Sequence, residues 1–145
     1  MEIVNKSAKF NYFILEEIEC GIELKGNEVK SIKEGSCNIK DSYAIIRNNE
    51  VFVINMFIKK YKDASIFAAD EMRMRKLLLH KKEIKKLKKA IEVEGATLVP
   101  LKLYFVRNKI KLLLGVCKGK KNYDKREAIK TREVNIALQR ELKNY

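Results

Sequence analysis

The chain has 145 residues, the size of one domain, and 46% of them are hydrophobic, which excludes disorder throughout. Its 32 Lys and Arg residues outnumber 19 Asp and Glu residues, for a net charge of +13. A balance this basic favours a polyanionic partner, either nucleic acid or an anionic membrane surface. A genome rich in Lys codons would also raise the charge, but it explains clustered charge less well.

Several classes of protein find no support in the sequence. The longest uninterrupted apolar run, LLLGVC, is far shorter than the roughly 20 residues of a membrane span. The N-terminal stretch MEIVNKSAKFNYF has no apolar segment typical of a secretory signal, so we expect a cytoplasmic protein. Cys20, Cys37 and Cys117 are widely scattered and His80 is the only histidine, so we expect core cysteines, no metal and no cofactor.

The first half of the chain alternates strand and turn signals. Residues 11–24 predict a strand, with a bulge at Gly21. Residues 26–35, between two glycines, predict a helix of about two turns. Residues 41–58 predict a hairpin that turns at Asn48-Asn49, because Asn tolerates positive φ.

The second half adds a longer helix and another hairpin. Residues 70–95 predict a helix capped by Asp70 and ended by Gly95. Its apolar face contains Leu77, Ile84, Leu87 and Ile91, and the other side contains Lys82, Lys85, Lys86 and Lys89. Residues 97–117 predict a hairpin that turns at RNK, with Pro100 at an edge or at the start of a strand. The whole pattern predicts a mainly β protein with helices (α+β), forming a small OB-like barrel.

The pattern changes after Lys118, where apolar periodicity stops. Seven residues from Lys118 to Arg132 are Lys or Arg, and the only regular apolar stripe beyond them, Val134, Leu138 and Leu142, is thin. An isolated helix of this length is marginal in water. We therefore expect a barrel domain over residues 1–118 and a basic tail over residues 119–145, which is disordered or loosely helical alone.

Motifs of catalysis are missing from the sequence. It has no GxSxG, HExxH, GxGxxG or Walker motif. Glu16 and Glu17 are adjacent in a predicted strand, so their side chains point to opposite faces. We therefore expect that the protein is not an enzyme.

Basic segments favour RNA or DNA as the partner. Nine residues from Arg73 to Lys89 are Lys or Arg, against the single acidic Glu83, and Lys30 and Lys33 add a second cluster. Such residues neutralise phosphates and release counterions, which is the main source of affinity for nucleic acids. Tyr12, Phe13, Tyr43 and Tyr104 would stack on unpaired bases if exposed, although core packing is the commoner role of strand aromatics.

Five segments, in one order, resemble a known family. They are NKSAKFNYFILEEIECGIELKGNEVKSIKEG, NIKDSY, RMRKLLLHKKEI, GATLVPLKLYF and GVCKGKKNYDKR. Together they resemble the SsrA-binding protein family (small protein B), over nearly the whole chain. The resemblance implies an OB-like barrel with embedded helices and a C-terminal tail.

The resemblance also implies a function without catalysis. Members bind the transfer-RNA-like domain of transfer-messenger RNA (tmRNA) and escort it into the empty A site of a stalled ribosome. Their tail enters the vacant messenger channel beside the decoding centre and becomes helical there. It thus implies two partners, tmRNA and the ribosome, and the chain is expected to act as a monomer.

Motif matching transfers roles to individual residues. The expected RNA-binding residues are Asn5, Lys6, Tyr12, Glu19, Lys30, Arg75, Lys76, Leu78 and His80. Within this set, Glu19 accepts a hydrogen bond from a base amino group or orients a nearby Lys. The expected ribosome-binding residues of the tail are Gly119, Lys120, Lys121, Tyr123, Asp124, Lys125, Arg126, Lys130 and Arg132.

The chain departs from the family in places, and other interpretations stay open. Asp70-Glu71 stands where the family usually has Asp-Pro, the segment before it is atypical, and the extension before Asn5 is short. The alternatives are another ribosome- or structured-RNA-binding translation factor with an OB-like fold, a small RNA-processing enzyme, and a protein that binds anionic membranes.

Overall fold

The computed structural model describes residues 2–60 and 70–119, which form nine strands and three helices. The strands are β1 (Glu2–Val4), β2 (Tyr12–Ile22), β3 (Cys37–Asn38), β4 (Tyr43–Arg47), β5 (Glu50–Ile54), β6 (Phe57–Ile58), β7 (Arg75–Leu78), β8 (Thr97–Val106) and β9 (Lys109–Gly119). The helices are α1 (Ala8–Asn11), α2 (Gly26–Lys33) and α3 (Lys81–Glu94).

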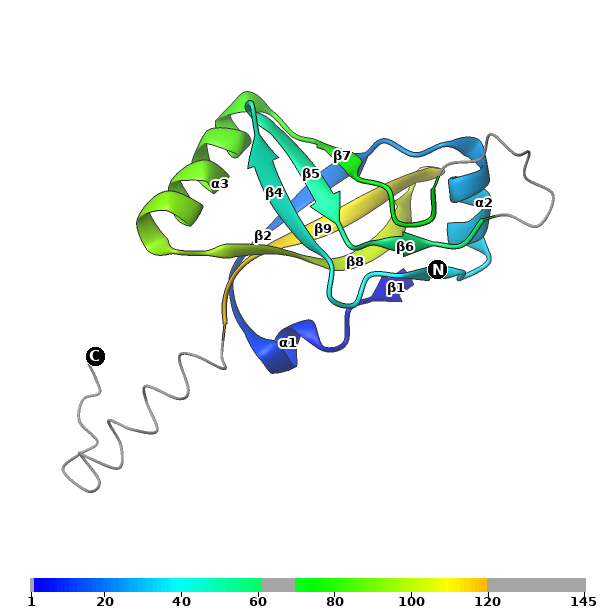
Figure 1. Cartoon of the computed structure of the whole chain (residues 1–145), viewed down its shortest axis with the longest axis horizontal. Helices are drawn as coiled ribbons and strands as arrows, with labels where there is room; N and C mark the ends of the chain where they lie inside the picture. Colours follow the sequence, from blue (N-terminus) through cyan, green and yellow to red (C-terminus); the bar gives the residue numbers. More distant parts are fainter. Residues whose placement is uncertain (1, 61–69, 120–145) are drawn as a thin grey trace, which may run out of the picture.

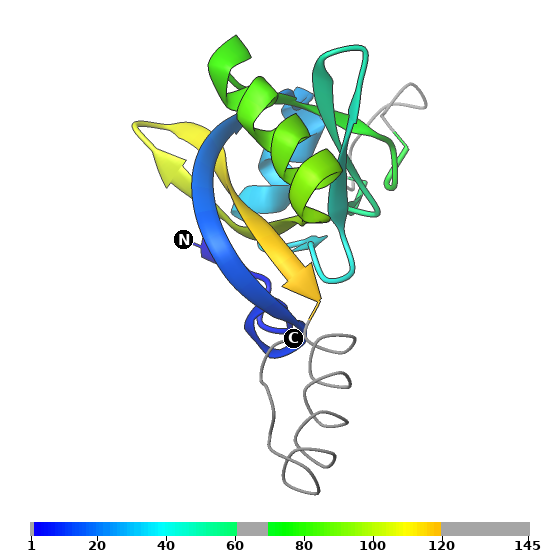
Figure 2. The same ribbon diagram turned by 90° about the vertical axis from the view of Figure 1, so that its left-hand side faces the viewer.

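The main sheet closes on itself. Its strand order is β1-β8-β4-β5-β7-β2-β9, and β9 also pairs with β8, so the strands from β8 round to β9 form a ring. β2 is long and strongly curved beside β9 (Figure 2), while α3 and α2 lie at opposite ends of the barrel (Figure 1). The predicted small barrel with embedded helices is therefore confirmed.

The strands of the barrel differ greatly in the number of residue pairs that join them to their neighbours. β2 and β9 pair from Tyr12–Gly119 to Gly21–Lys111, and β8 and β9 pair along almost their whole length. By contrast, the backbones of β4 and β8 pair only at Ala44 and Leu98. The narrowest junction of the ring thus lies between the first hairpin and the second, and the next narrowest is that of β7 with β2, which is two residue pairs long.

Both predicted hairpins are present, with the predicted turns. Asn48 and Asn49 have φ of 53° and 61°, and Arg107 and Asn108 have φ of 50° and 65°. Two successive residues with positive φ are the mark of a type I′ turn, whose twist matches that of the flanking strands. The first hairpin is shorter than expected, because the chain turns again at Asn55 and the next strand, β6, pairs with β3.

The helix predicted from Asp70 to Gly95 is wrong in its first half. Residues 75–78 form β7, which pairs with β5 and β2, and α3 begins only at Lys81. The Asp70 carboxylate accepts a hydrogen bond from the Met72 N–H in a turn, and His80 with Glu83 caps the helix instead. The predicted end is confirmed, since Gly95 terminates α3 with φ of 68°.

Two local predictions about strands are also wrong. The register shift in β2 falls between Ile14 and Glu16, whereas Gly21 pairs regularly with Lys111 on one side and Leu78 on the other. Pro100 is buried inside β8, next to a register shift rather than at the start of the strand. A bulge is the other position where a sheet tolerates the missing N–H of proline.

Two apolar clusters hold the domain together. The larger fills the barrel and includes Cys20, Leu77, Leu87, Leu103 and Leu112. The smaller lies outside the barrel, where Ala8 of α1 packs on Val99, Leu101 and Cys117. The prediction that cysteines are core residues is confirmed for Cys20 and Cys117, which are buried free thiols; burial raises their pKa values to about 12 and about 11.

Candidate nucleic-acid interface

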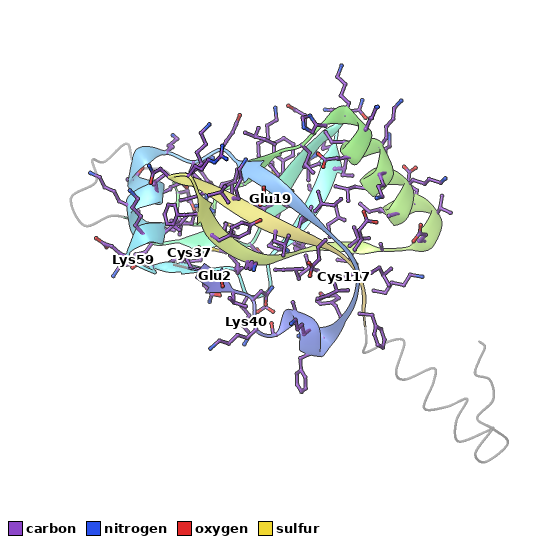
Figure 3. The ribbon with its side chains drawn as sticks, turned by 180° about the vertical axis from the view of Figure 1, so that it is seen from behind. Glu2, Glu19, Cys37, Lys40, Lys59 and Cys117 are labelled. Carbon is purple, nitrogen blue, oxygen red and sulfur yellow. The ribbon has the colours of Figure 1, made fainter. Side chains whose placement is uncertain are left out.

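The alternation of side chains along three strands creates one outward face. Residues 18, 20 and 22 of β2 point into the barrel core, as do residues 110, 112 and 114 of β9, so their neighbours in sequence point outward. We call the resulting outer surface the Glu19 face; it consists of Glu17, Glu19, Lys102, Tyr104, Lys111 and Leu113. Figure 3 views the molecule from this side, with β8 and β9 crossing between Glu19 and Glu2.

Glu19 is held by a residue far away in sequence. The Tyr104 hydroxyl donates a hydrogen bond to Glu19 Oε2 over 2.5 Å. Burial and the Glu19 carboxylate raise the pKa of Tyr104, so its hydroxyl keeps its proton and remains a donor. Lys102 Nζ lies 5.4 Å from the centroid of the Tyr104 ring and pairs with Glu2 over 3.4 Å. Acidic, phenolic and cationic groups thus share one small surface.

Asn5 is buried and does not present its side chain to solvent, contrary to its predicted place in an RNA contact. Its amide nitrogen donates to the Pro100 carbonyl over 2.9 Å, and its backbone N–H donates to the Leu101 carbonyl over 2.8 Å. Its side-chain oxygen accepts from the Ser7 hydroxyl. These bonds fasten the N-terminal segment to β8, and they leave the next residue, Lys6, exposed.

A cavity of about 440 Å³ separates this N-terminal segment from the Glu19 face. Its wall includes Lys6, Lys9, Glu17, Lys102 and Leu113. An apolar floor with cationic and anionic groups at its rim suits a nucleotide, which has an apolar ring face, polar base edges and a phosphate.

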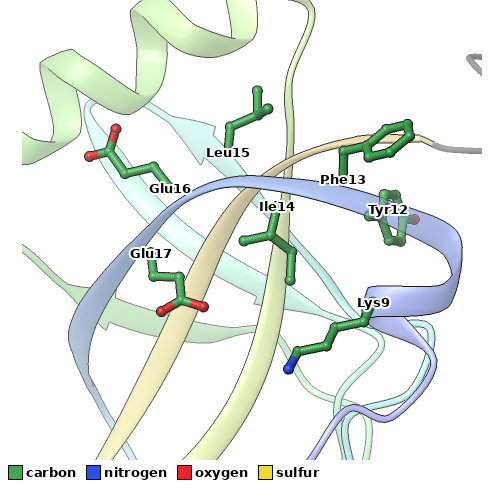
Figure 4. A pocket seen from close by; sticks show the side chains of 7 residues that line it. All are labelled: Lys9, Tyr12, Phe13, Ile14, Leu15, Glu16 and Glu17. Atoms are coloured by element: carbon green, nitrogen blue, oxygen red, sulfur yellow. The ribbon is translucent and has the colours of Figure 1, made fainter.

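Tyr12 lies at the start of β2, half-buried against the smaller apolar cluster. It pairs with Gly119, the last residue of β9, which places the beginning of the predicted tail beside it. A second pocket, of about 520 Å³, runs along this part of β2. In Figure 4, Tyr12 and Phe13 lie at one end of it and Glu16 and Glu17 at the other, with Lys9 nearby on α1.

β7 brings further predicted residues to the outer surface. Leu78 is 46% exposed and lies against Gly21, where a Cβ would be 3.2 Å from the Leu78 Cβ, so Leu78 adjoins the Glu19 face. Lys76 points outward as well, but it pairs with Glu50 over 2.6 Å, and that hydrogen bond raises its pKa. His80 is exposed and caps α3, with its backbone N–H donating to the Glu83 carboxylate.

Arg75 is fully buried, so it is not available for the RNA contact predicted for it. Arg75 Nε donates to Glu28 Oε2 over 2.8 Å, and its other nitrogens donate to the carbonyls of Met56 and Glu71. Arg73 donates to both oxygens of the same Glu28. We call Glu28, Arg73 and Arg75 the Glu28 cluster; it ties α2 to the start of β7. Burial opposes ionisation of Glu28, but the hydrogen bonds from Arg73, the Lys25 backbone and Arg75 outweigh it and lower its pKa.

The basic helices form two separate surfaces. Lys30 is exposed on α2, at the opposite end of the barrel from α3 (Figure 1). The predicted lysine face of α3 is confirmed as exposed, and Lys86 within it pairs with Glu16 of β2. Of the predicted tail, only Gly119 is described; Lys120, Lys121, Tyr123, Asp124, Lys125, Arg126, Lys130 and Arg132 lie outside the described residues.

Sequence reasoning named Tyr104 only as an aromatic that stacks if exposed, and it did not single out Lys102, Lys111 or Leu113. The period-2 alternation within each strand places Lys102 with Tyr104 and Lys111 with Leu113, and the two-residue turn at Arg107-Asn108 brings the two pairs to the same face. Their closeness to Glu19 follows only from the strand register.

Comparisons with known proteins place the chain in a family. A family model for the SmpB protein matches residues 2–144. The chain belongs to the SmpB family. The SsrA-binding protein of Borreliella afzelii is 52% identical over 97% of this chain and 94% of its own length. That of Caldicellulosiruptor bescii is also 52% identical, over 97% of this chain and 89% of its own length.

A solved member of the SmpB family has a similar structure. It is a chain from work described as "tmRNA-SmpB: a journey to the center of the bacterial ribosome". The two chains superpose with a TM-score of 0.72 and 43% sequence identity, over 94% of this chain and 96% of that one.

None of the helices within residues 2–60 and 70–119 has the length and apolar character of a membrane-spanning segment. In the same ranges no three His, Cys, Asp or Glu residues are grouped so that they could hold a metal ion.

Proposed function

We propose that the chain binds the tRNA-like domain of tmRNA and delivers it to the A site of stalled ribosomes, for rescue and peptide tagging. Membership of the SmpB family supports this, as does the printed name of the relatives, SsrA-binding protein. The single observation that carries the assignment to a surface is the Glu19 face, an oriented carboxylate among lysines beside a nucleotide-sized cavity.

The proposal divides the work between two parts of the chain. The barrel, residues 1–118, holds the RNA without catalysing a reaction and without a cofactor. The tail, from Gly119 onward, contacts ribosomal RNA in the decoding centre and the messenger channel. The protein acts as a monomer in the cytoplasm. The phosphate backbone is attracted by the lysines, and the base is recognised by Glu19.

The role of Glu19 is tested against plain electrostatics. Glu19→Ala and Glu94→Ala both remove one exposed carboxylate, but Glu94 is the last residue of α3. If charge alone governed binding, both variants would bind the tRNA-like domain equally or more tightly than the unchanged protein. We expect Glu19→Ala to bind about tenfold or more weakly, because a charge-assisted hydrogen bond is lost, and Glu94→Ala to bind normally. Fluorescence anisotropy measures both, and equal behaviour of the two would contradict the proposal.

The tail is tested in the full-length chain. Changing Asp124, Lys125 and Arg126 together to Ala lowers the net charge by one unit, so long-range attraction to RNA barely changes. We expect normal tmRNA affinity but loss of peptide tagging in a reconstituted translation system. The matched control changes Arg47, Glu94 and Lys109 to Ala, which are exposed residues outside the Arg73–Lys89 cluster; the charge difference is the same, and tagging should stay normal.

Tagging that survives the tail changes would contradict the proposed role of the tail and show that it is only a solvated charged segment. A separate titration of the unchanged protein with ribosomal RNA tests the alternative function. Tight binding to ribosomal RNA but not to tmRNA would favour a different ribosome-binding translation factor.

A further inference from the structure

The bond between Tyr104 and Glu19 crosses a strand. Tyr104 belongs to β8 and Glu19 to β2, and β9 runs between them, with Lys111 opposite Tyr104 and Leu113 opposite Glu19. The hydroxyl therefore reaches over β9 to meet Glu19 Oε2 at 2.5 Å. Such a bond depends on the register of three strands and is not a by-product of neighbouring positions in one hairpin.

The ring of Tyr104 is itself supported. Its face lies under Lys102, whose Nζ is 5.4 Å from the ring centroid and is tied to Glu2. A tyrosine ring has few rotatable bonds, so a supported ring presents its hydroxyl at a defined place. The exposed Glu19 side chain, which alone would sample several rotamers, is thereby restricted.

The chemistry of the restricted carboxylate suits one class of base. With Oε2 engaged by a phenol, Oε1 keeps its lone pairs for an outside donor. Adenine, cytosine and guanine each have an exocyclic amino group that donates to such an oxygen, and uracil has none. Leu113 and Leu78 flank the site with apolar surface for the ring of an unpaired base.

We propose that Tyr104 is a positioning residue for base recognition: it holds Glu19 so that Oε1 accepts from the exocyclic amino group of an unpaired adenine, cytosine or guanine. The inference rests on the proposed function, since it assigns to Tyr104 a share in the RNA contact of Glu19. It adds both the residue that orients the carboxylate and the class of base that the carboxylate selects.

The test compares four full-length variants with the unchanged protein. Tyr104→Phe removes only the hydroxyl, Glu19→Gln removes the charge, and the double variant removes both. Tyr43→Phe is the control, because it deletes the hydroxyl of an exposed tyrosine on β4, outside the Glu19 face, and keeps the ring that would stack on a base. Each is titrated by fluorescence anisotropy against a transcript of the tRNA-like domain, and thermal melting checks the fold.

We expect Tyr104→Phe to bind about three- to tenfold more weakly and Glu19→Gln about ten- to a hundredfold more weakly, with normal melting. The double variant should match Glu19→Gln within about twofold, because Tyr104 acts only through Glu19. Tyr43→Phe should bind normally. The inference would be overturned if the affinity loss of the double variant equalled the product of the two single losses, or if Tyr104→Phe bound with normal affinity.

Two further results separate the inference from the proposed function. Normal affinity of Glu19→Gln would show that Glu19 has no role in binding RNA, and it would contradict both the inference and the proposed Glu19 contact. Normal affinity of Tyr104→Phe together with weakened binding of Glu19→Gln would contradict the inference alone. Transcripts in which each unpaired adenine, cytosine or guanine is replaced in turn by uridine identify the base. On one of them the difference between Tyr104→Phe and the unchanged protein should vanish, and a difference that persists on all of them would refute base selection.

Discussion

Replacing Glu28 by Gln tests what holds α2 to the barrel. Glu28 is 3% exposed and receives three hydrogen bonds from arginine nitrogens, at 2.6, 2.8 and 3.1 Å. Glutamine keeps one acceptor oxygen but turns an amino group toward the guanidinium groups. The Arg75 side chain, which is 0% exposed, would then be a buried cation without a counter-charge.

The expected cost is large for one substitution. Removing one partner of a buried ion pair costs about 3–5 kcal/mol, from a total stability of about 5–15 kcal/mol for an ordinary domain. Arg73→Gln is the matched comparison, because Arg73 donates to the same carboxylate but is 27% exposed. Water compensates part of that loss, so we expect Arg73→Gln to cost only about 1 kcal/mol.

Urea unfolding of the full-length chain, followed by far-UV circular dichroism at pH 7, measures both variants. A loss below about 1 kcal/mol for Glu28→Gln, or equal losses for the two variants, would refute the reasoning. The first result would mean that backbone carbonyls alone hold the arginines, and the second that burial of Arg75 does not decide the cost.

Acid supplies an independent check on the same cluster. The pKa of Glu28 is lowered from its ordinary value of 4.5, so the ionised form stabilises the fold above about pH 4.5. That stabilisation is lost as the pH falls through the lowered pKa. The gap in unfolding free energy between the unchanged protein and Glu28→Gln should therefore be constant from pH 7 to pH 5 and shrink in stronger acid.

Three other predictions concern packing, a helix end and RNA affinity. Gly115→Ala should cost about 1–3 kcal/mol in thermal unfolding, because its Cβ would lie 2.9 Å from Leu101 Cδ1; an unchanged melting temperature would mean that the smaller apolar cluster is loosely packed. Gly95→Ala should cost about 1 kcal/mol in urea unfolding, since its φ is 68°, and a neutral effect would contradict a left-handed cap. Affinity for tmRNA should fall about 10³- to 10⁵-fold between 50 and 200 mM salt, for about 6–10 phosphate contacts; a flat anisotropy titration series would exclude phosphate contacts as the main source of affinity.

The parts of the fold that sequence predicts have local causes. Asn48-Asn49 is sufficient for a hairpin turn, and Gly95 for a helix end. The strand β7 was missed because three consecutive leucines fit either period, and its conformation is set by pairing with β5 and β2. The strands that determine the conformation of β7 are distant in sequence, so no local sequence pattern indicates it.

The candidate site shows the same limit. Glu19 was found by resemblance, but its partner Tyr104 is 85 positions away and meets it only through the register of β9. Asn5 and Arg75 are polar residues of the kind that contact RNA. Both are nevertheless buried, and each donates hydrogen bonds to backbone carbonyls that are distant in sequence. Residue type indicates what a side chain can bind, and tertiary structure decides whether it faces the partner.

The narrow seam between β4 and β8 determines where the barrel opens most easily. Separating these strands breaks the single pair Ala44 and Leu98, whereas opening the ring between β2 and β9 would break a ladder that runs from Tyr12 to Gly21. A cavity of about 330 Å³, lined by Ile46 and Ile91 among others, already lies at the seam. We therefore expect fluctuations of the closed ring to take the form of a hinged swing of the β4-β5 hairpin against α3, with larger displacements there than in the long β2-β9 ladder that contains Glu19.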